Sequence, residues 1–405
     1  MEVILEQKDA ADWVYRGEGA ANLVLAYSGS SPAFIGKVMR IQKVPRNGSN
    51  CVRSPTALTA QERLLWGDIE ELIASPNKEI AGELYVQHVM SPLLGSKYVD
   101  AGMRVLASRE FLESVEKNII SKRPTWRVDA AKVDTLCSSV LLLSDHSLFH
   151  HGNLDGGPCI CVEIKPKCGF LPNSRFISEG TAIKKKITRF RMHQATEVTS
   201  RRGNLIFGGL GGGATNTNCP IAEAFEDELK STIGGNDGLR TESFLQLVSE
   251  ALHKSGVLDR LLEVQKLDNV DIEGAIHAYY DLVNQKCMVC EELGKQEASK
   301  KFTSLHSVPL DESLKIVKDY LIAATAKDCS LMVSFTPRED GDSQSIYNNV
   351  YLESTNQNFD FKVYFIDLDL KALTKVEEYY DLDKRIVSCY SQMSEMDQGR
   401  EKTTT

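Results

Sequence analysis

The chain of 405 residues is 42% hydrophobic and 25% charged, an ordinary globular composition with enough apolar residues for a sizeable core. Its 47 lysines and arginines against 56 aspartates and glutamates give a net charge of -9, which disfavours a protein that coats nucleic acid. No apolar run approaches the roughly 18 residues that span a bilayer, and the first residues lack the pattern of a signal peptide. Ten cysteines without a framework spacing favour a reducing compartment, so we expect a cytoplasmic or nuclear protein without a membrane or nucleic-acid partner.

The first hundred or so residues have the pattern of a small α/β lobe. Two apolar runs, Trp13–Tyr15 and Leu23–Tyr27, flank a glycine-bearing turn and predict a hairpin. Further strands are predicted at 34–44, 103–112 and 140–143, and helices at 62–74 and 78–90. At roughly 100–200 residues per domain, the length predicts two or three domains or two large lobes.

A strand is predicted at 159–167, where side chains alternate between two faces. Ile160, Val162 and Ile164 share one face, and Cys161, Glu163, Lys165 and Lys167 share the other. Later segments are more helical, with helices predicted at 241–252, 271–284 and 311–327, strands at 331–335 and 359–370, a mobile glycine-rich loop at 208–213 and a frayed end over the last fifteen residues.

The turn of the predicted hairpin is Arg16-Gly17-Glu18-Gly19-Ala20-Ala21-Asn22. Two glycines allow backbone amides to approach the phosphates of a nucleotide, and the strand–turn–strand setting favours a lid of the kinase type. A plain glycine turn is the alternative, since so short a motif needs its structural context. The nearby cations Lys37 and Arg40 have opposite parity on their strand, so only one can point into a cleft, and the pattern does not choose between them.

Charge is concentrated on and after the strand at 159–167. Three charged residues on one face of an apolar strand indicate a face that lines a cleft, where a carboxylate could help hold magnesium and lysines could contact phosphate. Between 165 and 191 only Glu179 opposes the basic residues Lys165, Lys167, Arg175, Lys184, Lys185, Lys186, Arg189 and Arg191. In an acidic protein this surplus predicts a site for a highly phosphorylated ligand. A solvated strand and a solvated helix face are the alternatives.

Two further groups carry chemistry. Four residues, His277, Cys287, Cys290 and His306, offer the nitrogen and sulfur ligands of a closed structural zinc site, with unrelated thiols and histidines as the alternative. Two aspartates at strand ends, Asp328 and Asp367, fit phosphoryl transfer, in which one carboxylate orients the attacking hydroxyl and another holds the metal. A turn residue and a strand-terminal residue are their alternatives.

Several motifs together resemble the plant type of inositol-pentakisphosphate 2-kinase, over nearly the whole chain. They are Tyr15-Arg16-Gly17-Glu18-Gly19, Asp145-His146-Ser147-Leu148-Phe149, Glu163-Ile164-Lys165-Pro166-Lys167-Cys168-Gly169-Phe170, Ala323-Ala324-Thr325-Ala326-Lys327-Asp328-Cys329-Ser330 and Phe365-Ile366-Asp367-Leu368. The resemblance implies an α/β (α+β), two-lobed inositol-polyphosphate-kinase-like fold, distantly similar to protein kinases, with a structural zinc. It places an N-terminal lobe at 1–145 and a C-terminal lobe at 146–405. It also implies Mg²⁺-dependent transfer of the ATP γ-phosphate to the 2-hydroxyl of inositol 1,3,4,5,6-pentakisphosphate, giving the hexakisphosphate phytate.

The resemblance also implies the role of each site residue. Nucleotide contacts fall on Gly19, Ala20, Ala21, Asn22, Arg40, Ser144, Asp145, His146, Glu163, Ile164 and Lys165, with Ser144 to His146 facing adenine. Asp367 would hold magnesium, while Asp328 and Lys165 would act in catalysis. Substrate phosphates would be held by Arg127, Lys167, Arg189, Lys371, Lys375 and Tyr379, and zinc by His277, Cys287, Cys290 and His306.

The chain departs from the family at two places. The family usually has an arginine where Lys375 stands, and it has a much longer segment, with further phosphate-binding residues, where this chain has only 194–202. We therefore keep two alternatives: a catalytically impaired, zinc-stabilised module that binds inositol polyphosphates, and an inositol phosphate kinase of other regiochemistry. We expect a monomer.

Overall fold

The computed structural model describes residues 4–46, 57–149, 158–193, 220–235, 238–293, 302, 304–338 and 345–402. Compactness divides the chain into two units, each built from segments that are not contiguous in sequence. Unit 1 comprises Met1–Pro55, Asp100–Val162 and Met332–Tyr364, and unit 2 comprises Thr56–Val99, Glu163–Leu331 and Phe365–Thr405. The segments predicted at 194–202 and 208–213 lie outside the described residues.

Unit 1 contains a largely antiparallel sheet whose strands follow the order β1-β5-β7-β4-β3-β2. These strands are β1 (Ile4–Leu5), β5 (Met103–Ala107), β7 (Ser139–Ser144), β4 (Lys37–Pro45), β3 (Asn22–Tyr27) and β2 (Trp13–Glu18), and a short β6 (Ala131–Val133) pairs with β4. The predicted hairpin is confirmed, since β2 and β3 pair antiparallel with Trp13 opposite Tyr27. A bulge between Tyr15 and Gly17 shifts the register just before the glycine-bearing turn.

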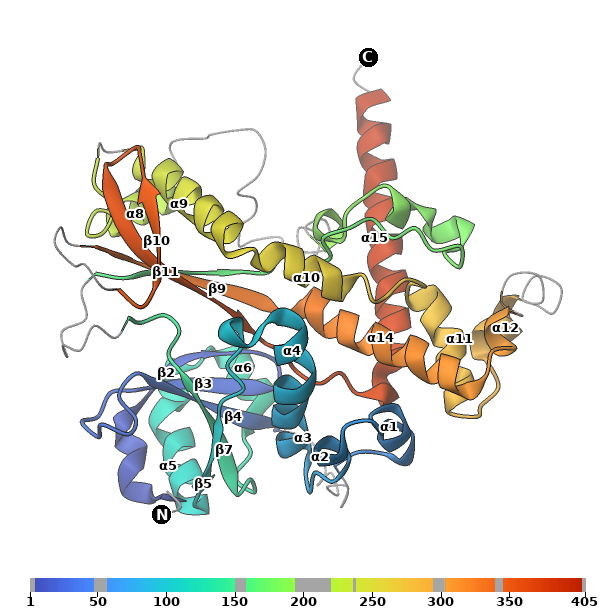
Figure 1. The fold of residues 1–405 in the computed structure, drawn as a ribbon, viewed down its shortest axis with the longest axis horizontal. Coiled ribbons are helices and arrows are strands. Elements are labelled where there is room, and N and C mark those ends of the chain that lie inside the picture. Colours follow the sequence, from blue (N-terminus) through green and yellow to red (C-terminus); the bar gives the residue numbers. More distant parts are fainter. Residues whose placement is uncertain are drawn as a thin grey trace. The chain divides into compact units, whose positions relative to one another are not determined.

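The core of this sheet is one cluster of apolar side chains. Alternate residues of β3 and β4, such as Leu23, Leu25 and Met39, are fully buried in it. Helix α5 (Arg109–Ile119) adds its buried face to the same cluster and lies against the sheet in Figure 1. The predicted strand 103–112 is therefore wrong beyond Ala107, because the Ser108 side chain accepts a hydrogen bond from the Phe111 amide and begins a helix. A second short helix, α6 (Thr125–Ala130), precedes β6.

The first helices of unit 2 are more broken than the sequence predicted. The predicted helix 62–74 is two helices, α1 (Ala60–Leu65) and α2 (Glu70–Ile73), because α1 ends at Trp66. Helix α3 (Lys78–Tyr85) continues through a π turn (Val86–Met90) into α4 (Ser91–Leu94). Pro92 lies in the first turn of α4, and the wider π turn before it accommodates a residue that cannot donate a backbone hydrogen bond.

Long helices form the rest of unit 2. They are α8 (Pro220–Leu229), α9 (Arg240–Ser255), α10 (Val257–Gln265), α11 (Ile272–Leu282), α12 (Met288–Leu293), α14 (Leu310–Asp328) and α15 (Val376–Lys402), with short 3₁₀ turns at Glu179–Lys185 and Leu373–Lys375. Helix α11 is buried along nearly its whole length because α14 and α15 pack against it. Helix α15 extends to Lys402, so residues 391–402 are helical where the sequence predicted fraying, while 403–405 lie outside the described residues. None of the helices in the described part of the chain has the length and apolar character that crossing a membrane requires.

A second sheet has the strand order β10-β11-β9-β8. Its strands are β10 (Asn348–Leu352), β11 (Gln357–Ile366), β9 (Ser330–Pro337) and β8 (Ile160–Ile164). Three of them confirm predicted strands, while β10 was not predicted. The alternation predicted for β8 is confirmed by its alternating exposure as far as Lys165. The two predicted aspartates flank this sheet, since Asp328 lies just before β9 and Asp367 just after β11.

Candidate active site

The end of β8, the start of β9 and the end of β11 bring charged residues together within unit 2. The Ser330 hydroxyl donates to Glu163 Oε1 at 2.7 Å, which joins the start of β9 to the end of β8. Lys165 Nζ lies 3.3 Å from Asp367 Oδ2 and 3.7 Å from Glu163 Oε1. Glu163, Lys165 and Asp367 are all about half exposed, so these charges remain accessible to a ligand.

Two of the predicted functional residues have a left-handed backbone. Lys167 has a φ of 58° just after β8, and Asp367 has a φ of 61° just after β11. This region is unusual for residues other than glycine and is often found at functional sites. β8 itself ends at Ile164, and the left-handed backbone of Lys167 lies beyond it, so the Lys167 side chain does not continue the charged face of β8.

Asp328 ends α14 between two lysines. Lys371 Nζ donates to Asp328 Oδ2 at 2.6 Å, and Lys167 Nζ lies 3.7 Å from Oδ1. Burial acts to raise the pKa of Asp328, but the two lysines outweigh it and hold that pKa below its ordinary value. With its side chain 57% exposed, Asp328 is an ionised and accessible carboxylate.

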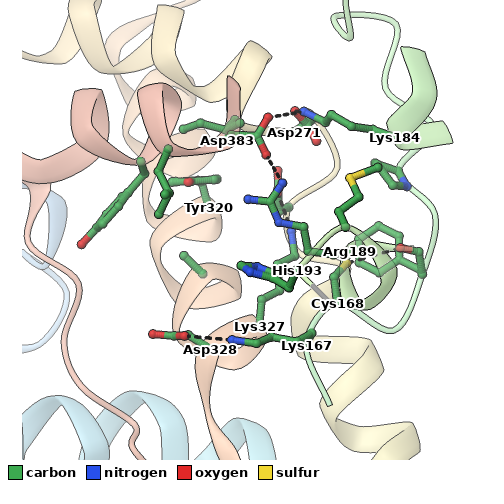
Figure 2. A pocket seen from close by; sticks show the side chains of 18 of the residues that line it. Lys167, Cys168, Lys184, Arg189, His193, Asp271, Tyr320, Lys327, Asp328 and Asp383 are labelled. Carbon is green, nitrogen blue, oxygen red and sulfur yellow. Dashed lines mark hydrogen bonds and ion pairs between the residues drawn. The ribbon is translucent and has the colours of Figure 1, made fainter. Parts of the chain in front are cut away.

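A cavity of about 260 Å³ opens beside Asp328 within unit 2. Figure 2 shows the side chains around this cavity. They come from the segment after β8, from the 3₁₀ turn Glu179–Lys185 and the residues that follow it, and from α14 and α15. Four residues predicted to hold substrate phosphates line it together with Asp328: Lys167, Arg189, Lys371 and Tyr379. Lys375 is not among its lining residues and lies 4.0 Å from Glu378. Arg127, on α6, belongs to unit 1.

Carboxylates from distant segments neutralise part of the basic cluster. Lys184 Nζ is buried and contacts three carboxylates, with Asp271 at 2.5 Å, Glu273 at 3.1 Å and Asp383 at 2.8 Å. Burial would lower the pKa of Lys184, but these carboxylates raise it above the ordinary value. Asp383 also accepts from Arg189 Nη1 at 2.7 Å (Figure 2). The three carboxylates could have formed a metal site, but the ammonium of Lys184 occupies their centre.

A histidine that the sequence analysis did not select also lines the cavity. Burial lowers the pKa of His193 to about 4, and the nearby cations Arg189 and Lys167 act in the same direction. His193 is therefore neutral at physiological pH. It adds hydrogen-bonding capacity to the cavity without a further charge.

The glycine-bearing turn of unit 1 is held by the buried Lys43 and the partly exposed Arg127. Gly19 O accepts from Lys43 Nζ at 2.7 Å and from Arg127 Nη1 at 3.1 Å. Glu18 is buried between Lys43 and Arg123, and Arg123 donates to both of its carboxylate oxygens, at 2.9 and 3.0 Å. The sequence analysis missed Lys43 and Arg123. No local pattern signalled the Lys43–Glu18 pair, because Glu18 is on β2, Lys43 is on β4 and β3 lies between these strands.

The two candidate cations of β4 have separate roles. Lys37 Nζ donates to Ser144 Oγ at 3.2 Å. Arg40 donates through Nη2 and Nε, at 2.8 and 3.1 Å, to the side-chain oxygen of Asn22 when that amide is oriented to satisfy both groups. Arg40 is therefore the cation that lies against the predicted nucleotide turn.

The segment predicted to face adenine uses its side chains for structure. The Asp145 and His146 side chains are buried. His146 stacks on Tyr364 with 3.7 Å between ring centroids, and its Nε2 lies 3.1 Å from Asp100 Oδ2. Asp145 Oδ1 accepts from the amide of Ser147 at 3.0 Å. Much of the backbone is engaged as well, since the amides of Ser144 and Asp145 donate to Asp100 Oδ2 and Gly36 O, and His146 O accepts from Ser334 Oγ.

The four predicted zinc ligands lie together in unit 2. His277 Nδ1 lies 3.1 Å from His306 Nε2, 3.3 Å from Cys287 Sγ and 3.4 Å from Cys290 Sγ. One zinc bound tetrahedrally by two nitrogens and two sulfurs would separate these atoms by about 3.3–3.8 Å, so the set fits one ion. His306 Nδ1 also lies 2.7 Å from Asp281 Oδ1, which the sequence analysis missed although Asp281 follows His277 by one helical turn. A carboxylate behind a histidine is the usual support of such a ligand.

The sequence is similar to known proteins along nearly its entire length. The family described as inositol-pentakisphosphate 2-kinase matches residues 15–202 and 198–385. A protein of Arabidopsis thaliana named inositol-pentakisphosphate 2-kinase is 52% identical over 99% of this chain and 98% of its own length. A rice protein of Oryza sativa subsp. japonica with that enzyme name is 44% identical over 98% and 97%, and one of Danio rerio is 27% identical over 95% and 94%.

The match to the family is divided at the segment predicted to be short. Its two matched ranges meet at residues 198–202, inside 194–202. The alignment with the Arabidopsis protein extends over 445 positions, more than the 405 residues of this chain, so that relative has residues without a counterpart here.

Proposed function

The chain belongs to the inositol-pentakisphosphate 2-kinase family, and from this premise we propose that it transfers the γ-phosphoryl group of ATP to the 2-hydroxyl of inositol 1,3,4,5,6-pentakisphosphate. The observation that carries the proposal is the cavity beside Asp328, where four predicted phosphate ligands and an accessible carboxylate meet. Phosphoryl transfer consists mostly of positioning and charge neutralisation, and this cavity offers both.

For unit 1, we propose contacts with the phosphates of ATP. Lys43 and Arg127 bind the carbonyl oxygen of Gly19, and the Lys43 amide donates to Ala21 O at 2.8 Å. The Gly19 amide donates to Asn22 O at 2.9 Å, so the amides of Ala20 and Ala21 are the groups we propose for the phosphates, as in a phosphate-binding nest. Arg40 adds a cation beside Asn22. We propose that Ser144–His146 contacts adenine through its backbone.

For unit 2, we propose separate tasks for the two aspartates. Asp328 accepts a hydrogen bond from the attacking hydroxyl and orients it, since its lowered pKa keeps it ionised. Asp367 would hold Mg²⁺, which needs only one or two protein carboxylates when phosphates supply its other ligands, and which neutralises charge on those phosphates. Glu163 and Ile164 would lie at the nucleotide, and Lys165, beside Asp367, would balance charge during transfer.

For the substrate, we propose that Lys167, Arg189, Lys371 and Tyr379 hold phosphates of the inositol ring inside the cavity. Arg127 and Lys375 are proposed as outer phosphate ligands, on the ground of family resemblance. Lysines paired with Asp328 can exchange that carboxylate for phosphate when the substrate enters, because both are anionic oxygen groups.

We also propose a two-lobed kinase-like fold, with lobes at 1–145 and 146–405, and a structural zinc held by His277, Cys287, Cys290 and His306. The fit of those four ligand atoms to one tetrahedral ion supports the zinc. We propose a monomer in the cytoplasm or nucleus; the location is supported by the eight cysteines of the described residues, none of which is in a disulfide.

The proposal is tested by incubating the protein with the pentakisphosphate, ATP and Mg²⁺ and assigning the new phosphate by NMR. We expect hexakisphosphate with the added phosphate at position 2. Phosphate at another position would establish a kinase of other regiochemistry. Tight binding of the hexakisphosphate without ADP formation would instead support the catalytically impaired binding module.

A further inference from the structure

A buried glutamine joins two parts of the candidate active site. Gln265 is the last residue of α10, and it is only 1% exposed. Its Nε2 donates to Lys167 O at 2.8 Å and to Ala326 O at 3.0 Å, while its Oε1 accepts from the Gly169 amide at 2.8 Å. The side-chain amide therefore uses both of its donor hydrogens and its acceptor on backbone groups.

The backbone groups that Gln265 binds belong to the segments that carry Lys167 and Asp328. Lys167 and Gly169 form the turn after β8, where Lys167 has its left-handed backbone. Ala326 is in the last turn of α14, two residues before Asp328. Lys167 Nζ and Asp328 Oδ1 face each other at 3.7 Å, and Gln265 fixes the backbones behind both of them.

The contact depends on a glycine as well as on an amide. A Cβ on Gly169 would lie 3.3 Å from Gln265 Oε1 and 3.4 Å from a methyl of Leu262. The first distance is shorter than most contacts that Cβ atoms make in proteins. The absence of a side chain lets the Gly169 amide reach the glutamine oxygen. Glutamate cannot donate the two hydrogen bonds when ionised, and methionine of similar length can make none of the three.

We propose that Gln265 is a positioning residue for the transfer, holding the phosphate-binding Lys167 and the hydroxyl-orienting Asp328 at their working separation. The inference rests on the proposed function, because it gives Lys167 and Asp328 their tasks. A shift of about 1 Å in such a pair is enough to lower a rate about 100-fold. Gln265 is not among the residues that line the cavity, so it would act through Lys167 and Asp328.

The test compares Gln265→Met with wild type by kinetics and by calorimetric titration. We expect kcat to fall about 10-fold or more and the Kd for the pentakisphosphate to rise. The Kd for a non-hydrolysable ATP analogue should stay within about twofold, because the nucleotide contacts are not held by Gln265. Gly169→Ala, which crowds the same contact from the other side, should change the same quantities in the same direction.

The control for a general loss of stability is Tyr98→Phe. The Tyr98 hydroxyl donates a part-buried hydrogen bond at 2.6 Å to Ser255 O, on the last residue of α9, just before α10 begins, and its loss should lower the melting temperature without changing kcat. Gln265→Glu gives a second measurement. A protonated glutamate regains one donor, so its rate relative to wild type should rise as the pH falls.

Wild-type kinetics by Gln265→Met at a temperature where it is folded would overturn the proposal. So would a decrease in kcat that Tyr98→Phe reproduces at equal loss of stability. If Gln265→Met does not fold, a pH-independent ratio for Gln265→Glu overturns it. If the wild type makes no hexakisphosphate, the proposed function fails, and the binding titrations still test Gln265, since unchanged pentakisphosphate affinity would refute its role.

Discussion

At the scale of single residues, the candidate site is dominated by the pairing of Asp328 with two lysines. Its carboxylate is held by Lys371 at 2.6 Å and faces Lys167 at 3.7 Å. A carboxylate that orients a hydroxyl should be ionised, and a lysine that binds phosphate should be charged. The ion pairs between Asp328 and the two lysines favour the charged form of each partner. The sequence could suggest Asp328 from its place before a strand, but not its lysine partners.

Replacing Asp328 with alanine should abolish phosphate transfer, or lower kcat by at least about 100-fold, because the hydroxyl loses the group that orients it. The affinity for nucleotide should remain close to that of the wild type. Quenched time-course assays of hexakisphosphate formation measure kcat, and titration with an ATP analogue measures the nucleotide affinity. Unchanged turnover would remove Asp328 from the mechanism.

Replacing Lys371 with methionine should move the acid limit of activity to higher pH. The lysines lower the pKa of Asp328, so the wild-type carboxylate stays ionised, and active, below the ordinary pKa of an aspartate. Without Lys371 that pKa rises, and activity is lost at a higher pH as the solution is acidified. The pH profile of kcat at saturating substrate measures the shift.

Lys315→Met is the matched control for this profile, because Lys315 is an exposed lysine of α14 paired with Asp319. Its profile should coincide with that of wild type. A Lys371→Met profile that also coincides with wild type would show that Asp328 is not the group whose ionisation limits activity at low pH.

At the scale of elements, Lys184 connects three parts of unit 2. It belongs to the 3₁₀ turn Glu179–Lys185, and its carboxylate partners belong to the N-terminus of α11 and to α15. The sequence analysis counted Lys184 as part of a local surplus of charge for a ligand. In the structure Lys184 is buried and forms ion pairs with three carboxylates. The number of basic residues in the segment could not show this, because Asp271, Glu273 and Asp383 are distant in sequence.

Replacing Lys184 with methionine should destabilise the protein by about 3–5 kcal/mol, because three buried carboxylates then lack their cation. Lys185→Met is the matched control, since Lys185 is the exposed neighbour of Lys184 and should be nearly neutral. Urea denaturation of both variants measures the difference. Equal midpoints for the two variants would contradict the role of Lys184.

The elements that were predicted well are those with a strong local pattern. The hairpin of β2 and β3, the alternating β8 and the long α14 follow from apolar spacing over their own residues. The strand predicted at 103–112 is confirmed as far as Ala107 and wrong beyond it, because the Ser108 cap begins a helix there. The helix predicted at 62–74 is interrupted after Leu65 and forms the two helices α1 and α2. Short apolar runs do not distinguish strand from helix, so a capping residue decided the first case.

At the scale of the whole molecule, a protein of net charge -9 has several basic side chains around one cavity. The family resemblance implied that Lys167, Arg189, Lys371 and Tyr379 hold one ligand, and the structure brings these four residues to that cavity. The carboxylates that pair with the basic cluster could not be predicted, because ion pairs between distant segments leave no periodic signal. The buried contacts of Gln265 left none either, since they are made to backbone groups.

Metal binding is a second property that acts on the molecule as a whole. The four proposed zinc ligands come from α11, from the start of α12 and its preceding residue, and from the segment before α14, so one ion would join elements up to 29 residues apart in sequence. A structural zinc contributes its binding free energy to folding, because the unfolded chain has no preformed site. Loss of the ion should therefore lower the stability of the folded protein directly, and phosphate transfer only as a consequence of that lower stability.

Replacing Cys287 with serine should reduce the zinc content from about one ion per chain to nearly none and should lower the melting temperature. Cys389→Ser is the matched control, since Cys389 is a half-buried cysteine of α15 outside the four-residue cluster, and it should keep both properties. Elemental analysis and thermal denaturation with and without a chelator measure the effects. A wild-type protein that is free of zinc and equally stable with the chelator would refute the site, because the ligand atoms would then be held in place by packing alone.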